Sequence, residues 1–217
     1  MPAPVSSRQA TPALAWFDGP PGRAVLDSER DVVEEALREW PGRPWLWLAP
    51  CPARPPGGLG FGLQLAAGPG GWHGPLQCGE PLPLADESMG AVLLQHAGDL
   101  GVDPRPLLAE CARVLEPRGR LWLLALNPFT PYRRHWAGCG VDCAEPVTWR
   151  RRLRAAGLAP EPVSAGLGPR WKPEPAPQRQ HGAGLRAAYL LRAEKRIVAP
   201  VPPEPVPALG WQPGLPA

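Results

Sequence analysis

Residues 89–126 read MGAVLLQHAGDLGVDPRPLLAECARVLEPRGRLWLLAL, and this stretch decides the fold. It begins and ends with nearly continuous apolar runs, Met89–Gln95 and Leu121–Leu126, which are typical of strands buried on both faces of a parallel sheet. Between them, Asp103-Pro104 offers a helix start, and apolar residues then recur at helical spacing. The order strand, helix, strand predicts a βαβ crossover unit.

Weaker elements flank this unit. The pattern predicts a helix over residues 28–40, short strands at 45–49, 63–66 and 76–78, and a loop in the Pro- and Gly-rich stretch 50–62. After the unit we expect a short helix at 148–156 and an antiparallel strand pair near 162–164 and 187–191. The predicted fold class is α/β, an open, mostly parallel doubly wound sheet with helices on both faces and an antiparallel strand pair at the end.

Length and composition predict one domain with unstructured ends. The chain has 217 residues, of which 34 are Pro and 25 are Gly. We expect residues 1–22 to be a flexible lead-in and residues 23–196 to form the domain. Residues 197–217 are expected to be a disordered Pro-rich tail, in which Trp211 offers an anchor for a protein partner.

The remaining composition bears on compartment and partners. The five cysteines are odd in number and scattered, unlike a disulfide framework. No apolar run approaches the roughly 20 residues that a membrane span needs, and no secretory signal is evident. We therefore expect a cytoplasmic protein with no membrane partner. A net charge of +3 does not by itself argue for a nucleic-acid partner.

Two segments carry a family resemblance. Residues 82–96, LPLADESMGAVLLQH, and residues 106–126, PLLAECARVLEPRGRLWLLAL, resemble the second half of type 11 methyltransferase domains. In those domains an "LPF-x-D-x-S" segment precedes a strand and a histidine, and a helix ending in "RVLxPGGxL" precedes the next strand. The domains are class I S-adenosylmethionine-dependent enzymes. The resemblance therefore implies a Rossmann-like fold, S-adenosylmethionine as cofactor and transfer of a methyl group to an acceptor that the sequence does not identify.

The resemblance also implies a location for the site, over the carboxyl ends of the sheet strands. The implied cofactor-binding residues are Ala49, Cys51, Cys78, Glu80, Gln95 and His96. The acceptor would approach from the segment 127–141, with Asn127 and Tyr132 on the substrate side. No catalytic residue is assigned, because alignment carries much of the acceleration in methyl transfer.

The chain departs from the family in the cofactor-binding half. The turn after the first strand should be rich in glycine, but here it reads Ala49-Pro-Cys-Pro-Ala53, and proline removes N–H donors. The second strand ends without an acidic residue, and Cys78 stands where an Asp is expected, with Glu80 close by. Two functions remain open: a methyltransferase with an altered turn, or a non-catalytic protein of this fold that has lost cofactor binding and acts through protein contacts.

Three other patterns have ordinary structural explanations. His135, Cys139 and Cys143 recur every four residues, but the glycines between them argue against a helical zinc site, and no metal is expected. The arginines of Arg150–Arg154 are more typical of a solvated helix face than of a nucleic-acid site. The Asn-Pro-Phe segment that begins at Asn127 is interpreted as a turn that ends a strand.

Overall fold

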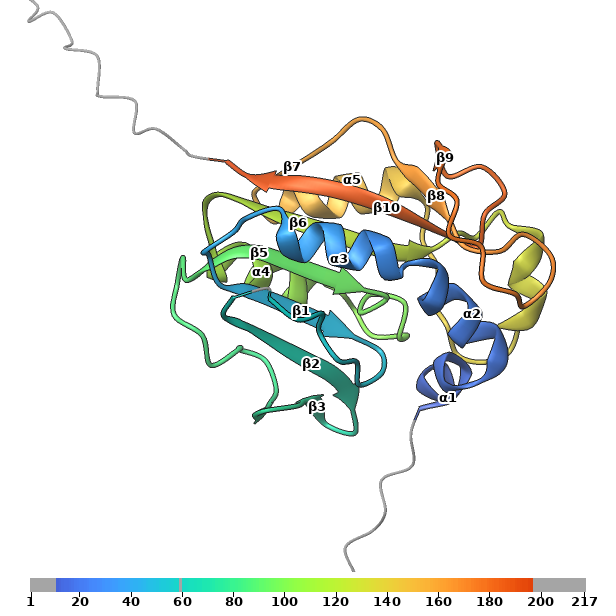
Figure 1. Ribbon diagram of the computed structural model, residues 1–217, viewed down its shortest axis with the longest axis horizontal. Coiled ribbons are helices and arrows are strands. Elements are labelled where there is room, and N and C mark those ends of the chain that lie inside the picture. Colours follow the sequence, from blue (N-terminus) through green and yellow to red (C-terminus); the bar gives the residue numbers. More distant parts are fainter. Residues whose placement is uncertain (1–10, 59, 197–217) are drawn as a thin grey trace, which may run out of the picture.

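A computed structural model describes residues 11–58 and 60–196 of the chain (Figure 1). The Pro-rich tail and its Trp211 lie outside the described residues, so the predictions for them stay predictions. Within the described ranges, no helix is long and apolar enough to cross a membrane.

A single twisted sheet forms the centre of the molecule, in the order β4-β3-β2-β1-β5-β6-β10-β8-β9. Its middle consists of the parallel strands β2 (Gly62–Gly68), β1 (Trp45–Ala49), β5 (Met89–Gln95) and β6 (Leu115–Leu126). The long strand β10 (Ala188–Lys195) pairs antiparallel with β6. The predicted fold class, an open and mostly parallel α/β sheet, is confirmed.

Short antiparallel strands complete both sides of the sheet. β3 (Gly71–His73) and β4 (Gln77–Cys78) follow β2 as a hairpin, with no helix before them. On the other side, β7 (Leu158–Pro160) and β8 (Ala165–Leu167) both pair with β10, and β9 (Gln180–His181) pairs with β8. The strand expected near 162–164 is therefore misplaced, since those residues connect β7 to β8. Among the described residues, the two outermost strands, β4 and β9, have only two residues each.

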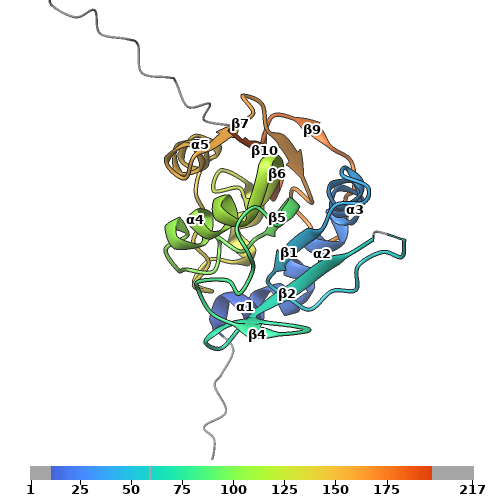
Figure 2. The same ribbon diagram turned by 90° about the vertical axis from the view of Figure 1, so that its left-hand side faces the viewer.

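Helices cover both faces of the sheet (Figure 2). α4 (Arg105–Val114) and α5 (Pro146–Ala155) pack on one face, where Trp149 and the leucines of the crossover form one core cluster. On the other face lie α1 (Pro12–Asp18), α2 (Pro20–Ser28), α3 (Arg30–Arg38) and the 3-10 helix η1 (Pro131–His135). Their apolar side chains form a second cluster with Trp47 and Trp122 of the sheet.

The flexible lead-in expected over residues 1–22 is wrong from residue 12 onward. α1 and α2 are formed there, and Phe17 and Val25 are fully buried. Prolines stand in the first turns of both helices, where the missing N–H is not needed. The sequence pattern misleads because a proline that begins a helix resembles a proline in a loop.

Candidate functional site

The site predicted from the sequence lies at the carboxyl ends of β1, β2 and β5, where ligands gather in sheets of this type. Ala49 ends β1 and Gln95 ends β5. The structure does not bring the predicted residues to one cavity. It places some of them at two separate hollows and His96 in a buried cluster, while Cys78, Asn127 and Tyr132 border neither hollow.

The larger hollow has a volume of about 370 Å³ and lies between the 50–56 loop and helices α2 and α3. Ala49, Cys51 and Gln95 border it, with Trp47 beneath them. In the connection from β1 to β2, the described residues 50–58 and 60–61 form no helix. This loop forms one wall of the hollow, and α2 and α3 form the other.

The smaller hollow, about 140 Å³, spans the ends of β2 and β5 on the other side of α1. Ala67, Trp72, Ala97 and Leu107 give it apolar walls, and Glu80 is the predicted site residue that borders it. Burial and the charge of Glu110 raise the pKa of Glu80. Cys78 lies on β4 and does not border this hollow, and burial raises the pKa of its thiol.

Helix α1 lies across the strand ends between the two hollows. The Phe17 ring packs against the imidazole of His96, with 4.9 Å between ring centroids. At the end of the helix, Asp18 Oδ1 accepts a hydrogen bond from Cys51 Sγ at 3.4 Å. Burial, together with the charge of Asp18, raises the pKa of the Cys51 thiol to about 12. Cys51 is therefore a protonated thiol that holds α1, and not a nucleophile.

His96 is the centre of a cluster of ionisable groups with no solvent exposure. Its Nδ1 lies 2.8 Å from Asp99 Oδ2, and its Nε2 lies 3.0 Å from Glu29 Oε1. Burial by itself lowers the pKa of His96, but the charge of Glu29 and the hydrogen bonds to both carboxylates outweigh it and raise the pKa to about 10. Both ring nitrogens donate, so the ring is an imidazolium held between two carboxylates.

This cluster joins the N-terminal helices to the sheet. Glu29 lies at the junction of α2 and α3 and also accepts a 2.8 Å hydrogen bond from Gln95 Nε2. Asp99 Oδ2 accepts one from the backbone N–H of Leu126, also at 2.8 Å. Burial raises the pKa of Asp99, whose Oδ1 has no hydrogen-bond partner within the described part of the chain. Because His96 has no exposure to either hollow, its role in this conformation is to position α1, α2 and α3.

The two substrate-side residues are buried and bonded inside the protein. Asn127 Nδ2 donates to the carbonyls of Gly184 and Arg186, and its Oδ1 accepts from the N–H of Phe129. Tyr132 donates its hydroxyl hydrogen to the Pro21 carbonyl at 3.0 Å. Neither residue borders the two hollows. In the structure Asn127 holds the segment 184–186 and Tyr132 holds the start of α2, and a contact with an acceptor stays a prediction.

Two members of the cluster, Glu29 and Asp99, were missed by the sequence analysis. Glu29 lies 67 residues before His96, and nothing in its local pattern indicates a buried partner. Asp99 had a weak signal, because it lies three residues after the histidine that ends the strand. Within the described residues, no group of three or more His, Cys, Asp or Glu side chains has the geometry to hold a metal ion.

Comparisons with known proteins agree with this fold. Residues 75–123 match the methyltransferase domain family, which is less than a quarter of the chain. A possible histamine N-methyltransferase from Thermotoga maritima has 17% identity and a TM-score of 0.56, and the alignment covers 85% of this chain and 100% of that one. An S-adenosylmethionine-dependent methyltransferase from Archaeoglobus fulgidus has 13% identity and a TM-score of 0.51, with 82% and 96% covered.

A third structure, a complex between a methyltransferase activator and the putative methyltransferase from Haloferax volcanii, has 14% identity and a TM-score of 0.51, with 85% of this chain and 98% of that chain covered. No curated protein matches the chain. At these identities the likeness shows the fold. The protein therefore has the fold of class I S-adenosylmethionine-dependent methyltransferases and, over residues 75–123, their domain signature.

Proposed function

We propose that the protein is an S-adenosylmethionine-dependent methyltransferase, acting on an unidentified acceptor, whose cofactor site opens when α1 moves away from the strand ends. The observation that carries this proposal is the smaller hollow, which lies at the ends of β2 and β5 with a carboxylate on its wall. The methyltransferase domain match over residues 75–123 supports it, because this segment includes Glu80 and β5.

The adenine end of the cofactor fits the residues present. The smaller hollow is a slot with apolar walls, and Glu80 borders it. A flat heteroaromatic ring matches such walls, and a carboxylate accepts hydrogen bonds from its amino group. Glu80 would thus hold the base, while Trp72 and Leu107 would exclude water from it.

The ribose and methionine ends do not fit the structure as it stands. β2 ends in Ala66-Ala-Gly68, with no carboxylate to accept the ribose hydroxyls. The turn after β1 contains Pro50 and Pro52, which lack N–H donors. The volume of the slot, about 140 Å³, is below the roughly 300 Å³ at which ligand pockets begin. Thr11 and Leu14, at the start of α1, border the slot, and Phe17 of the same helix packs on His96 after β5.

A shift of α1 would join the two hollows into one cleft across the strand ends. Such a shift has to break the Cys51–Asp18 hydrogen bond and the Phe17–His96 packing, and also the contacts of Trp16 with the His135 carbonyl and the Trp136 ring. When bound, S-adenosylmethionine supplies an electrophilic methyl group on its sulfonium. The protein's own contribution would be to align the acceptor and keep water out.

Titration calorimetry with S-adenosylmethionine tests the proposal. Asp18→Ala removes the acceptor of the Cys51 thiol, and losing a hydrogen bond of about 1 kcal/mol should favour the open state and tighten binding by about fivefold. Glu80→Gln should weaken binding by about tenfold, because it removes a charged acceptor. Asp86→Ala is the matched control, since Asp86 is an exposed carboxylate that pairs with Arg113, away from α1.

Asp86→Ala should bind as the wild type does. If neither the wild type nor folded Asp18→Ala binds S-adenosylmethionine at millimolar concentration, the enzyme proposal is wrong. The second candidate, a non-catalytic protein of this fold that acts through protein contacts, then stands. The observation that favours it is α1 itself, whose buried Phe17 occupies the strand ends.

The cellular compartment of the protein and a partner for its Pro-rich tail are also proposals. All five cysteines are free in the structure, which supports a reducing compartment such as the cytoplasm. A protein partner for the Pro-rich tail remains a proposal from the sequence, and deletion of residues 197–217 followed by a binding assay would test it.

A further inference from the structure

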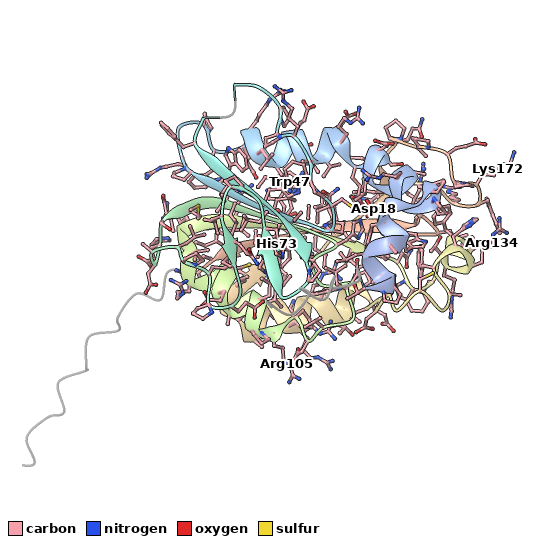
Figure 3. All side chains as sticks on the ribbon, turned by 90° about the horizontal axis from the view of Figure 1, so that it is seen from below. Asp18, Trp47, His73, Arg105, Arg134 and Lys172 are labelled. Carbon is pink, nitrogen blue, oxygen red and sulfur yellow. The ribbon has the colours of Figure 1, made fainter. Side chains whose placement is uncertain are left out.

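The segments 129–136 and 168–186, which we call the basic face, lie together beyond the carboxyl end of β6. Arg134 Nη2 donates to the Trp171 carbonyl at 2.9 Å, and His135 Nε2 lies 3.1 Å from the same oxygen. The Thr130 hydroxyl donates to the Leu185 carbonyl at 2.7 Å. Figure 3 shows Arg134 and Lys172 at the same end of the molecule.

The basic face concentrates the positive charge of the protein. Its two segments contain six Lys or Arg residues and one acidic residue, Glu174. This surplus of five exceeds the net charge of +3 of the whole chain, so the rest of the chain is net negative. The positive charge is therefore unevenly distributed, with much of it on this face and on the arginines of α5, which the net charge of the sequence does not reveal.

Five of the six cations of this face form no ion pair with a described carboxylate: Arg133, Arg134, Arg170, Lys172 and Arg186. The sixth, Arg179, pairs with Glu35. The arginines of α5 also form none among the described residues. By contrast, Arg23, Arg113 and Arg192 each form an ion pair with a nearby carboxylate. Burial and the charge of Arg170 lower the pKa of Arg186, which shows that like charges crowd there. An anion on this face would relieve that repulsion.

Exposed aromatic rings accompany these cations. Trp171 is 55% exposed and Phe129 is 63% exposed. A shallow hollow of about 490 Å³ lies beside Trp171, and Arg170, Lys172 and Arg186 line it. Glu174 also borders the hollow. The Nε of Arg186 is buried and has no hydrogen-bond partner among the residues that the structure describes.

We propose that the basic face binds single-stranded nucleic acid, with a base stacked on Trp171 and phosphates held by Arg170, Lys172 and Arg186. Single strands are bound in this way, through cationic grooves and aromatic rings that stack with bases. A concave surface with an exposed ring suits a strand better than a flat lipid surface does. The arginines of α5 fit less well, because the tryptophan of that helix, Trp149, is buried.

Fluorescence anisotropy with the full chain and a labelled oligouridylate tests the proposal. The oligonucleotide has about ten nucleotides, a length within the usual site sizes of single-strand binders. Trp171→Ala should weaken binding by about tenfold. Lys172→Gln should reduce the salt dependence, lowering the slope of log affinity against log salt by about 0.7. No methyl donor is added, so the result does not depend on the proposed methyl transfer.

Two matched controls locate the effect. Phe61→Ala removes an aromatic ring that is 88% exposed outside the basic face, and Arg105→Gln removes an exposed arginine elsewhere on the surface (Figure 3). Both should bind as the wild type does. The proposal is overturned if the wild type does not bind the oligonucleotide at about 50 mM salt, because phosphate contacts are strong at such a low salt concentration. It is also overturned if Arg151→Gln with Arg154→Gln abolishes binding while Trp171→Ala does not, or if the chain binds phosphatidylserine vesicles and not the oligonucleotide.

Discussion

Two halves of the same sheet are built in different ways. The crossover half, residues 89–126, connects β5 to β6 through α4, whose apolar side covers the sheet. The loop half, residues 45–73, connects β1 to β2 through a proline-rich loop whose described residues form no helix, and then turns back into β3 as a hairpin. Both halves keep parallel pairing at their centre. The difference teaches that the strand order of this fold survives the loss of a crossover helix when other helices, here α2 and α3, cover that face.

The His96 cluster, which fixes the N-terminal helices to the crossover half, is expected to give the largest effect. His96→Gln removes the cation from between Glu29 and Asp99 and leaves two buried carboxylates unbalanced. The free energy of unfolding should fall by about 3–5 kcal/mol, as when one partner of a buried ion pair is removed. Urea unfolding at pH 7 measures it. His181→Gln, on the outer strand β9, is the control and should change stability by less than about 0.5 kcal/mol; equal losses would refute the role of the cluster.

Truncation of one leucine in each half compares the two directly. Leu108 of α4 is buried in the core of the crossover half, and Leu63 of β2 is partly buried in the loop half. Leu108→Ala should lower the free energy of unfolding by about 2–4 kcal/mol, because it leaves a cavity. Leu63→Ala should cost about 1 kcal/mol, since less apolar surface is lost. Losses of the same size in urea unfolding would show that the halves are equally packed.

The pH dependence of the free energy of unfolding should also show whether His96 is protonated in the folded state. The folded pKa of His96 is about 10, above its usual 6.5, so the folded state holds a proton that the unfolded state releases. This stabilisation is complete below pH 6.5 and is lost as the pH rises to about 10, with a slope of at most about 1.4 kcal/mol per pH unit. The measured unfolding free energies of the wild type should therefore fall between pH 6.5 and about pH 8.5, below the range in which the cysteine thiols titrate. A flat profile over this range would contradict the charged state of His96.

The smallest effect is expected in the loop after β1. Pro52 is exposed, so Pro52→Gly should lower stability only by about 0.5–1 kcal/mol, through the greater freedom of the unfolded chain. The same change returns an N–H donor to the turn, and S-adenosylmethionine should bind more tightly in calorimetry. Pro55→Gly, in the same loop, is the control for backbone flexibility. Equal gains in both variants would mean that flexibility, and not the N–H group, limits binding.

Strands of both halves were predictable from local sequence signals, whereas the N-terminal helix α1 was not. Strands such as Met89–Gln95 were predictable because an apolar run buried on both faces is a local signal. α1 was missed because Pro12, at its start, resembles a loop residue. The residue types at the turn after β1 predict a weakened cofactor site, and this stays a prediction. The cluster of Glu29, His96 and Asp99 was beyond prediction as a unit, because tertiary packing alone brings residues 67 positions apart into contact.

The two-residue length of the outermost described strands, β4 and β9, has a consequence for behaviour at high concentration. A long free edge offers backbone N–H and C=O groups to a neighbouring molecule and promotes stacking into fibrils. The described borders of this sheet end in short strands, the two-residue β4 on one side and the two-residue β9 and three-residue β7 on the other. The folded protein should therefore resist polymerisation through strand addition, and aggregates formed on heating should require prior unfolding.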